Sequence, residues 1–229
     1  YHHLYPILIV SKLLSIELIV DFRDPWSLNI KNGYGIDRST VINKLKLFLS
    51  TYIEKRAYNA CKYFIVCTPG MKEGYRDLFK DDTKIILITN GHTIDPFIEK
   101  KENENTKVSQ LDFVCIGKFA EYDLEKAVRT LNKIKGFSER KEREYKIYFI
   151  GSNKSINEKA VKLSDLPIER IHFYDRMKYD EAIRIAGGCS VGICLIRNEN
   201  LDFGTKVFDY IGLGIPVIGD FDKKKHFYR

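Results

Sequence analysis

The chain has 229 residues, of which 44% are hydrophobic and 30% charged, and its formal net charge at pH 7 is +7. This length and composition are typical of a globular protein with one large domain or two small ones. The basic side chains do not gather in one stripe, which argues against a nucleic-acid partner, and no apolar run approaches the roughly 20 residues that span a bilayer.

The five cysteines lie in or beside apolar, strand-like runs. The sequence contains neither a C-x-x-C pair nor a Cys/His cluster with the spacing of metal ligands. This pattern predicts reduced, mostly buried thiols, as in a cytoplasmic protein, and no metal site. The residues are Cys61, Cys67, Cys115, Cys189 and Cys194.

In the first part of the chain, apolar strand patterns alternate with helix patterns, as a parallel sheet with crossover helices requires. Ser39 or Thr40 can cap the second helix, and residues 28–38 are rich in Gly and Asn, which predicts a loop. We expect strands at residues 17–21, 63–67 and 84–89, and helices at 6–14, 40–61 and 69–79.

The predicted helix 40–61 mixes apolar and basic side chains. Such a helix usually packs its apolar side against the sheet, which is the arrangement we expect. A helix that lies on an anionic membrane surface has the same composition, and this is the alternative. The apolar residues are Val41, Leu45, Phe48, Leu49, Tyr52 and Ile53, and the basic ones are Lys44, Lys46, Lys55 and Arg56.

Residues 101–110 are polar and show no apolar periodicity, so we expect a linker between an N-terminal domain, 1–100, and a C-terminal domain, 111–229. Both halves predict an α/β fold with a Rossmann-like parallel sheet, and such folds bind ligands at the carboxyl ends of the strands. In the second domain we expect strands at 111–116, 145–150, 170–174 and 189–196, and helices at 124–136, 156–163 and 179–186.

The stretch 204–218, GTKVFDYIGLGIPVI, is the most informative in the chain. Gly204 and Thr205 open a helix, where free backbone N–H groups and the helix dipole favour an anion. Lys206 adds a positive charge for phosphate in the first turn. Asp209 follows on the same helix face, and its carboxylate can accept two hydrogen bonds from a vicinal diol such as ribose. The stretch therefore predicts a nucleotide-diphosphate site.

Glycines and charged residues also follow the predicted strands of the second domain. A glycine at a strand end permits close approach of the backbone to a ligand, but it also makes a tight turn, so this pattern alone leaves both interpretations open. Combined with the GTKVFDY helix, it favours a ligand role for Lys206 and Asp209, while both interpretations stay open for Lys118. The residues are Gly117, Lys118, Gly151, Asp175 and Arg176.

Three segments of the chain resemble one known family. GTKVFDYIGLGIPVIG resembles the G-T-K-x-F-E-Y-x-x-x-G-x-P-V-I segment in the C-terminal domain of family-4-type retaining glycosyltransferases with the GT-B fold. DFRDPWS, at 21–27, looks like a strand-end motif of the N-terminal domain in the same group. TPGMKEGY and ITNGH, at 68–75 and 88–92, look like its last strand–helix–strand unit before the linker.

This resemblance, which runs from about Leu4 to Asp220, implies two Rossmann-like domains facing a cleft, with the N-terminal domain incomplete and the C-terminal domain lacking its closing segment. It implies a hexosyltransferase that moves sugar, with retention, from a nucleotide-sugar donor to a saccharide or lipid-linked saccharide acceptor. The expected context is cell-envelope or capsular polysaccharide synthesis. Such enzymes generally work without a metal, so no cofactor is expected.

The resemblance also implies roles for particular residues. Leu201 stands where many relatives carry a first glutamate, which puts donor-sugar contact by that carboxylate in doubt. Lys118 replaces the usual arginine, which keeps the charge but loses bidentate geometry. The implied catalytic residues are Lys206, Lys118 and Asp24, and the implied nucleotide-binding residues are Gly117, Gly151, Asp175, Arg176, Gly204, Thr205 and Asp209.

The DFRDPWS segment allows two interpretations. In the first, Asp24 or Arg23 contacts the acceptor or orients a neighbouring group, because both residues follow a predicted strand. Alternatively, an Asp–Arg pair fastens the loop, with Trp26 packed beneath, because charges this close to an apolar strand must be paired.

Two other functions stay open on the sequence. One is a sugar-nucleotide epimerase of the same fold, and the other is a nucleotide-sugar-binding protein without activity. For each of these proteins a cytoplasmic location is expected, with peripheral contact at the inner face of an anionic membrane as the alternative.

Overall fold

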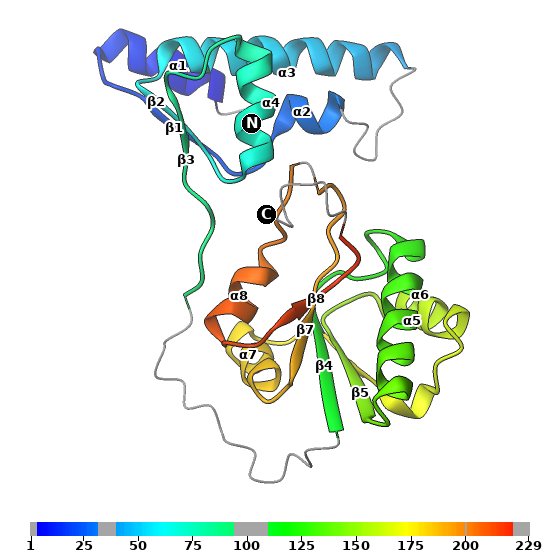
Figure 1. The fold of residues 1–229 in the computed structure, drawn as a ribbon. Helices are drawn as coiled ribbons and strands as arrows, with labels where there is room; N and C mark the ends of the chain where they lie inside the picture. The colour runs from blue at the N-terminus through cyan, green and yellow to red at the C-terminus, as the bar shows by residue number, and fades with distance from the viewer. Residues whose placement is uncertain (1–3, 32–39, 94–109, 200, 222–229) are drawn as a thin grey trace. The chain divides into compact units, whose positions relative to one another are not determined.

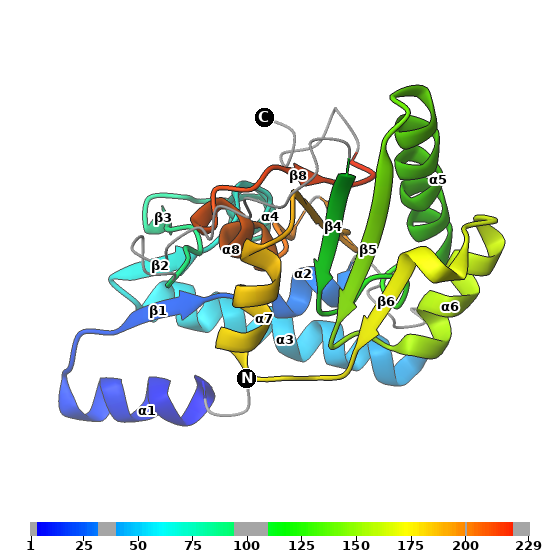
Figure 2. The same cartoon turned by 90° about the horizontal axis from the view of Figure 1, so that it is seen from below.

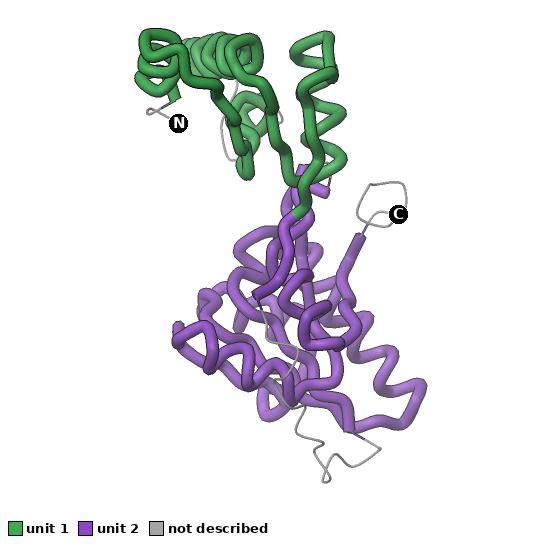
Figure 3. The backbone as a smooth tube through the Cα atoms, turned by 90° about the vertical axis from the view of Figure 1, so that its left-hand side faces the viewer, with its two compact units in different colours: residues 1–89 green, residues 90–229 purple. Residues whose placement is uncertain are grey.

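The computed structural model describes residues 4–31, 40–93, 110–199 and 201–221 (Figure 1). The chain divides into two compact units, Tyr1–Thr89 and Asn90–Arg229 (Figure 3). The predicted linker, 101–110, lies outside the described residues except for Gln110, which begins the first strand of the second unit.

The first unit contains a parallel sheet with strand order β1-β2-β3. Two helices start at side-chain caps: Thr40 accepts a hydrogen bond from the Asn43 amide, and Thr68 accepts one from the Met71 amide at 3.1 Å. The elements are α1 (Leu4–Leu14), β1 (Ile19–Phe22), α2 (Trp26–Lys31), α3 (Val41–Ala60), β2 (Tyr63–Val66), α4 (Pro69–Phe79) and β3 (Ile85–Leu87).

Aromatic rings in stacked and edge-to-face contact form the core of this unit. Phe64, on the central strand, is fully buried, and its ring centroid lies 5.2 Å from that of Phe22 and 5.1 Å from that of Tyr75. Tyr58 of α3 stacks on Phe79 of α4 at 4.3 Å. The Tyr58 ring also lies 5.9 Å from that of Phe64, so these contacts join both crossover helices to the sheet.

Two predictions for this unit are wrong in part. Residues 28–31 belong to helix α2 and not to a loop. The carboxylate of Glu54 on α3 accepts a hydrogen bond from the Ser27 amide at 3.0 Å, which supplies an acceptor for a backbone N–H in the first turn of that helix. The apolar residues predicted to pack helix α3 on the sheet are mostly exposed. The buried residues of α3 are instead Ser50, Glu54, Ala57 and Tyr58.

The second unit contains five parallel strands in the order β6-β5-β4-β7-β8. Helices α5 and α6 cover one face of this sheet, and α7 and α8 cover the other (Figures 1 and 2). The elements are β4 (Gln110–Ile116), α5 (Leu124–Arg140), β5 (Glu144–Ile150), α6 (Lys154–Leu163), β6 (Ile171–Tyr174), α7 (Tyr179–Gly187), β7 (Val191–Ile193), α8 (Lys206–Gly212) and β8 (Val217–Ile218), with a short 3₁₀ turn at Ile168–Arg170.

The five cysteines are all buried and free, as predicted. Burial raises the pKa of the Cys189 and Cys194 thiols to about 12, so both remain protonated at neutral pH.

The strand order reverses between β4 and β7, and this switch point is closed by Tyr210 of α8. Its ring lies against β7, where a β-carbon on Gly192 would stand 2.5 Å from it. Its hydroxyl accepts the Ile116 amide at 2.9 Å and lies 3.3 Å from the Val114 carbonyl and 3.4 Å from that of Ile193. The side chain is fully buried, so it anchors α8 to both strands.

We predict that Tyr210→Phe lowers the free energy of unfolding by about 1–3 kcal/mol, because a buried backbone N–H loses its acceptor. Urea denaturation measures this change. The control is Tyr174→Phe, whose side chain is 39% exposed and whose loss of a hydroxyl should change stability by less than about 0.5 kcal/mol. Equal effects of the two substitutions would contradict the anchoring role of the Tyr210 hydroxyl.

Candidate functional site

The carboxyl ends of β4, β5 and β6 bring several predicted residues into one row. The Gly117 amide donates to the Ile150 carbonyl at 2.8 Å, and the Gly151 amide donates to the Tyr174 carbonyl at 3.0 Å. A β-carbon on Gly151 would lie 3.7 Å from the Cα of Arg176. The loops that follow the three strands are thus held side by side, at the edge where doubly wound sheets bind ligands.

The charged residues of these loops point away from the core. Lys118, Asp175 and Arg176 are all exposed. Lys118 follows β4, next to the switch point of the sheet. Two cations with free access to solvent therefore stand along this edge, where an anionic ligand can reach them.

The start of α8 has the predicted backbone. Gly204 adopts a φ of +62°, and a β-carbon there would lie 3.1 Å from the Cys194 sulfur, so both conformation and space favour glycine. Thr205 precedes the helix with an exposed side chain that makes no capping hydrogen bond. Because α8 has only seven residues, the side chains of Lys206 and Asp209 matter more here than the helix dipole.

Lys206 and Asp209 lie together with a third residue, Tyr179, the first residue of α7. The Lys206 Nζ is 3.1 Å from Oδ2 of Asp209, and the Tyr179 hydroxyl donates to Oδ1 of the same carboxylate at 2.7 Å. The Lys206 ammonium also lies over the Tyr179 ring, 5.3 Å from its centroid. Asp209 is buried, so its charge is neutralised and hydrogen-bonded on both oxygens.

The geometry of this cluster is compatible with the roles that the sequence predicted for Lys206 and Asp209, and those roles stay predictions. Each carboxylate oxygen can accept two hydrogen bonds, so Asp209 still has one acceptor position on each oxygen for a diol. The Lys206 side chain is about one-third exposed and carries three donors, so it can turn toward a phosphate. Burial, and next the bond to Asp209, raises the pKa of Tyr179 to about 12, which keeps its hydroxyl a donor.

Tyr179 was missed by the sequence analysis. It begins a helix that was predicted, but no motif marks it, and it stands 30 residues before its partner. The only signal that could have found it is topological, because α7 and α8 cover the same face of the sheet.

A second buried carboxylate lies in the loop after β7. Glu199 pairs with Lys126 of α5 at 2.6 Å, and Lys126 also donates to the Ile196 carbonyl at 3.3 Å. Both side chains are largely buried. The pair ties this loop to the first turn of α5, so Glu199 is already engaged by a protein cation.

In the first unit, the DFRDPWS segment is fastened by its own charges. The Arg23 Nε lies 2.8 Å from Oδ1 of Asp21, and its Nη1 donates to the Ile88 carbonyl at 3.2 Å. This is the Asp–Arg pair of the second interpretation. Asp24 is exposed beside it, and its contact with an acceptor stays a prediction.

Glu54 of α3 holds the residues that follow the DFRDP sequence. Its carboxylate accepts the Ser27 amide, the Ser27 hydroxyl and the Tyr75 hydroxyl, the last at 2.9 Å. Glu54 is fully buried, and burial raises its pKa above the ordinary value of 4.5 despite these donors.

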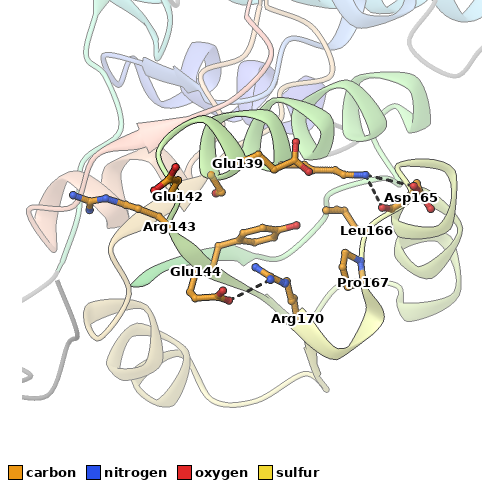
Figure 4. Close-up of a pocket in the computed structure, with 11 residues that line it drawn as sticks. Glu139, Glu142, Arg143, Glu144, Asp165, Leu166, Pro167 and Arg170 are labelled. Atoms are coloured by element: carbon orange, nitrogen blue, oxygen red, sulfur yellow. Dashed lines mark hydrogen bonds and ion pairs between the residues drawn. The ribbon is translucent and has the colours of Figure 1, made fainter. Parts of the chain in front are cut away.

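A different pocket, shown in Figure 4, lies at the amino ends of β5 and β6. It has a volume of about 680 Å³ and is lined mainly by charged side chains. These pair with one another: Arg170 with Glu144 at 3.2 Å, and Lys135 with Asp165 at 3.4 Å. None of the predicted site residues lines this pocket.

Within the described ranges, no group of three or more His, Cys, Asp or Glu side chains is placed to hold a metal ion. No described helix is both long and apolar enough to cross a membrane.

No family model and no curated protein matches the chain, but solved structures do. The crystal structure of WaaG, a glycosyltransferase involved in lipopolysaccharide biosynthesis, has a TM-score of 0.59 at 11% identity, covering 87% of this chain and 55% of that chain. The crystal structure of Anabaena HepE in complex with UDP and glucose has a TM-score of 0.57 at 13% identity, covering 93% and 55%.

At sequence identities this low, the similarity to these two structures concerns the fold. Each unit has the α/β architecture with a parallel sheet that is found in these GT-B glycosyltransferases, and the prediction of an α/β fold with Rossmann-like parallel sheets is confirmed. It spans 55% of the length of each of the two proteins.

We predict that the free energy of unfolding of the wild type, minus that of Glu54→Gln, decreases as pH rises from 4.5 through the raised pKa of Glu54 in the folded state. The folded state binds the Glu54 proton more tightly than the unfolded chain does. The stabilisation by this proton is therefore complete at pH values below the pKa of the unfolded state and is lost above the pKa of the folded state. Denaturant unfolding of both proteins at a series of pH values measures the difference, and titrations common to both cancel. A difference independent of pH would contradict the raised pKa.

Proposed function

We propose that the protein is a glycosyltransferase that moves a hexose from a nucleotide-sugar donor to a saccharide or lipid-linked saccharide acceptor. The observation that carries this proposal is the Lys206–Asp209 pair on α8, 3.1 Å apart, in the second unit of a GT-B fold. A cation for the diphosphate and a carboxylate for the ribose diol stand in one helical turn.

In this proposal each residue has a defined task. Lys206, Lys118 and the backbone at Gly204 and Thr205 bind the diphosphate, and Asp209 accepts hydrogen bonds from the ribose. The backbone at the other strand ends accommodates the rest of the nucleotide, close to Asp175 and Arg176. Asp24, at a strand end of the first unit, serves the acceptor.

The chemistry needs charge stabilisation more than a strong base. The bond between the anomeric carbon and the phosphate oxygen breaks, and the acceptor oxygen forms the new bond on the same face. The departing phosphate takes the acceptor proton on that face. Retention follows because the new bond forms on the face from which the phosphate leaves. Negative charge grows on the phosphate, and Lys206 and Lys118 stabilise it. In this scheme the reaction needs no metal and no further cofactor.

The solved structures of similar fold suggest which compounds to try first. HepE was crystallised with UDP and glucose, and WaaG is involved in lipopolysaccharide biosynthesis. UDP-sugars and acceptors from envelope or capsular polysaccharide synthesis are accordingly the first candidates for this protein.

We predict that Lys206→Ala reduces sugar transfer by about 100- to 1000-fold, the usual cost of losing one preorganised donor to a developing charge. Calorimetric binding of UDP, GDP and ADP and transfer from the matching nucleotide sugars measure the effect. Lys159→Ala, which removes an exposed lysine from α6, is the control and should retain full activity.

The same assay separates the alternatives. Near-normal transfer by Lys206→Ala would overturn the assignment of the donor site. Conversion of the donor sugar without any acceptor would instead identify an epimerase, and nucleotide binding without any turnover would identify a binding protein.

We also propose that the first unit contacts an anionic membrane surface through α3. Six apolar residues of α3 are exposed among the described residues, and on a helical wheel they fall within a stripe about 120° wide. This α3 stripe lies opposite the buried side of the helix, which holds Glu54 and Ala57. It consists of Val41, Ile42, Leu45, Phe48, Leu49 and Tyr52.

The charges of α3 fit the same partner. Lys44 and Lys46 are exposed and flank the α3 stripe on its two sides, and Lys55 and Arg56 add two further cations. The one acidic residue of α3, Glu54, is buried. A stripe of apolar side chains between lysines is the pattern of helices that lie in the membrane interface.

We predict that Leu45→Ser weakens binding to vesicles of phosphatidylcholine and phosphatidylglycerol, whereas Leu163→Ser does not. The two leucines are 56% and 57% exposed, so only the place of the side chain differs. The double substitution Lys44→Gln, Lys46→Gln should weaken the binding free energy by about 1 kcal/mol for each lysine. Added salt should also weaken binding, because it screens the same charges. Co-sedimentation measures all three.

Equal binding by both leucine variants would contradict contact through α3. A change of oligomeric state in Leu45→Ser, with no vesicle binding by the wild type, would assign the α3 stripe to another protein surface instead.

A further inference from the structure

The Tyr179 side chain connects the two residues of the proposed nucleotide site. Its hydroxyl donates to Oδ1 of Asp209 at 2.7 Å, and its ring lies under the Lys206 ammonium at 5.3 Å. Lys206 in turn contacts Oδ2 of Asp209 at 3.1 Å. Three side chains from two helices therefore form a closed set of contacts, in which each touches the other two.

The two contacts on Asp209 differ in how they respond to a ligand. Lys206 has a long, flexible stem and a side chain that is one-third exposed, so a diphosphate can draw its ammonium away from the carboxylate. Tyr179 has only two side-chain torsions and a neutral hydroxyl. It has no charge with which to follow the phosphate, and it remains on Oδ1.

The direction of the Tyr179 hydrogen bond is fixed by its partner. An ionised carboxylate can only accept, so the 2.7 Å contact places the hydroxyl proton toward Asp209. The high pKa of Tyr179, about 12, maintains this polarity at neutral pH.

We infer that Tyr179 is a positioning residue of the nucleotide site, which fixes the Asp209 carboxylate so that it distinguishes ribose from deoxyribose. The inference rests on the proposed function. Tyr179 occupies one acceptor position of Oδ1 and orients the remaining positions, to which the diol hydroxyls donate. Without it, once Lys206 has turned to the phosphate, Asp209 is free to rotate about its side-chain bonds.

The test is the ratio of affinities for a nucleoside diphosphate and its 2′-deoxy form. UDP, GDP and ADP are each measured by calorimetry against the deoxy compound, with full-length wild type and Tyr179→Phe. A hydrogen bond to a charged group is worth about 1.5–3 kcal/mol, so the wild type should prefer the ribose form by roughly 10- to 150-fold. In Tyr179→Phe this ratio should fall about tenfold, with little change in affinity for the deoxy form.

Two further variants make the result specific. Tyr63→Phe is the control, because that side chain has the same exposure, 41%, in the first unit. Asp209→Asn should abolish the preference for ribose, and adding Tyr179→Phe to it should change nothing more, because the tyrosine acts through the carboxylate.

The outcomes are distinguishable. If the wild type binds none of the nucleotides, the proposed function itself fails. If the wild type prefers ribose and Tyr179→Phe retains the full preference, the role of Tyr179 is overturned while the proposed function stands. An equal loss of affinity for both forms would also overturn it, since that result indicates general damage and not a loss of ribose recognition.

Discussion

The second unit depends on one close approach, between the Tyr210 ring and the glycine backbone of β7. Gly192 leaves room for the ring, since a β-carbon there would lie 2.5 Å from it, and the hydroxyl then reaches the Ile116 amide of β4. Helix α8 is thereby fixed at the point where the strand order reverses. Because Lys206 and Asp209 lie within one turn of Tyr210, this buried contact sets where the proposed site lies on the sheet.

A second constraint is that buried carboxylates need partners. Asp209, Glu199 and Glu54 are each buried. Asp209 is paired with a lysine and a tyrosine, Glu199 is paired with Lys126, and Glu54 accepts hydrogen bonds from a group of neutral donors. The differences have functional consequences. A partner with a flexible stem can be exchanged for a ligand, whereas the neutral donors around Glu54 hold helices α2 and α4 against α3.

The sequence predicted best what local chemistry determines. Helix α4 begins at Pro69 and ends at Phe79 as expected, because Thr68 caps it and the apolar spacing is regular. Helix α2 was missed because its cap, Glu54, comes from another helix and leaves no local trace. The exposed face of α3 was also mispredicted, since composition indicates that a helix is amphipathic but not which of its sides meets the sheet.

The same division holds within the candidate site. Lys206 and Asp209 could be read from the sequence because they lie three residues apart on one helix, whereas Tyr179 approaches them only through the packing of α7 beside α8. This packing bears on a departure from the resembled motif, in which a glutamate stands where this chain has Asp209. The aspartate is shorter by one methylene and has one torsion fewer, so a single hydroxyl contact at 2.7 Å is sufficient to restrict its orientation. A shorter carboxylate held by a fixed tyrosine can orient its free acceptor positions as well as a longer one that must reach for the ligand, and this makes the aspartate compatible with ribose recognition.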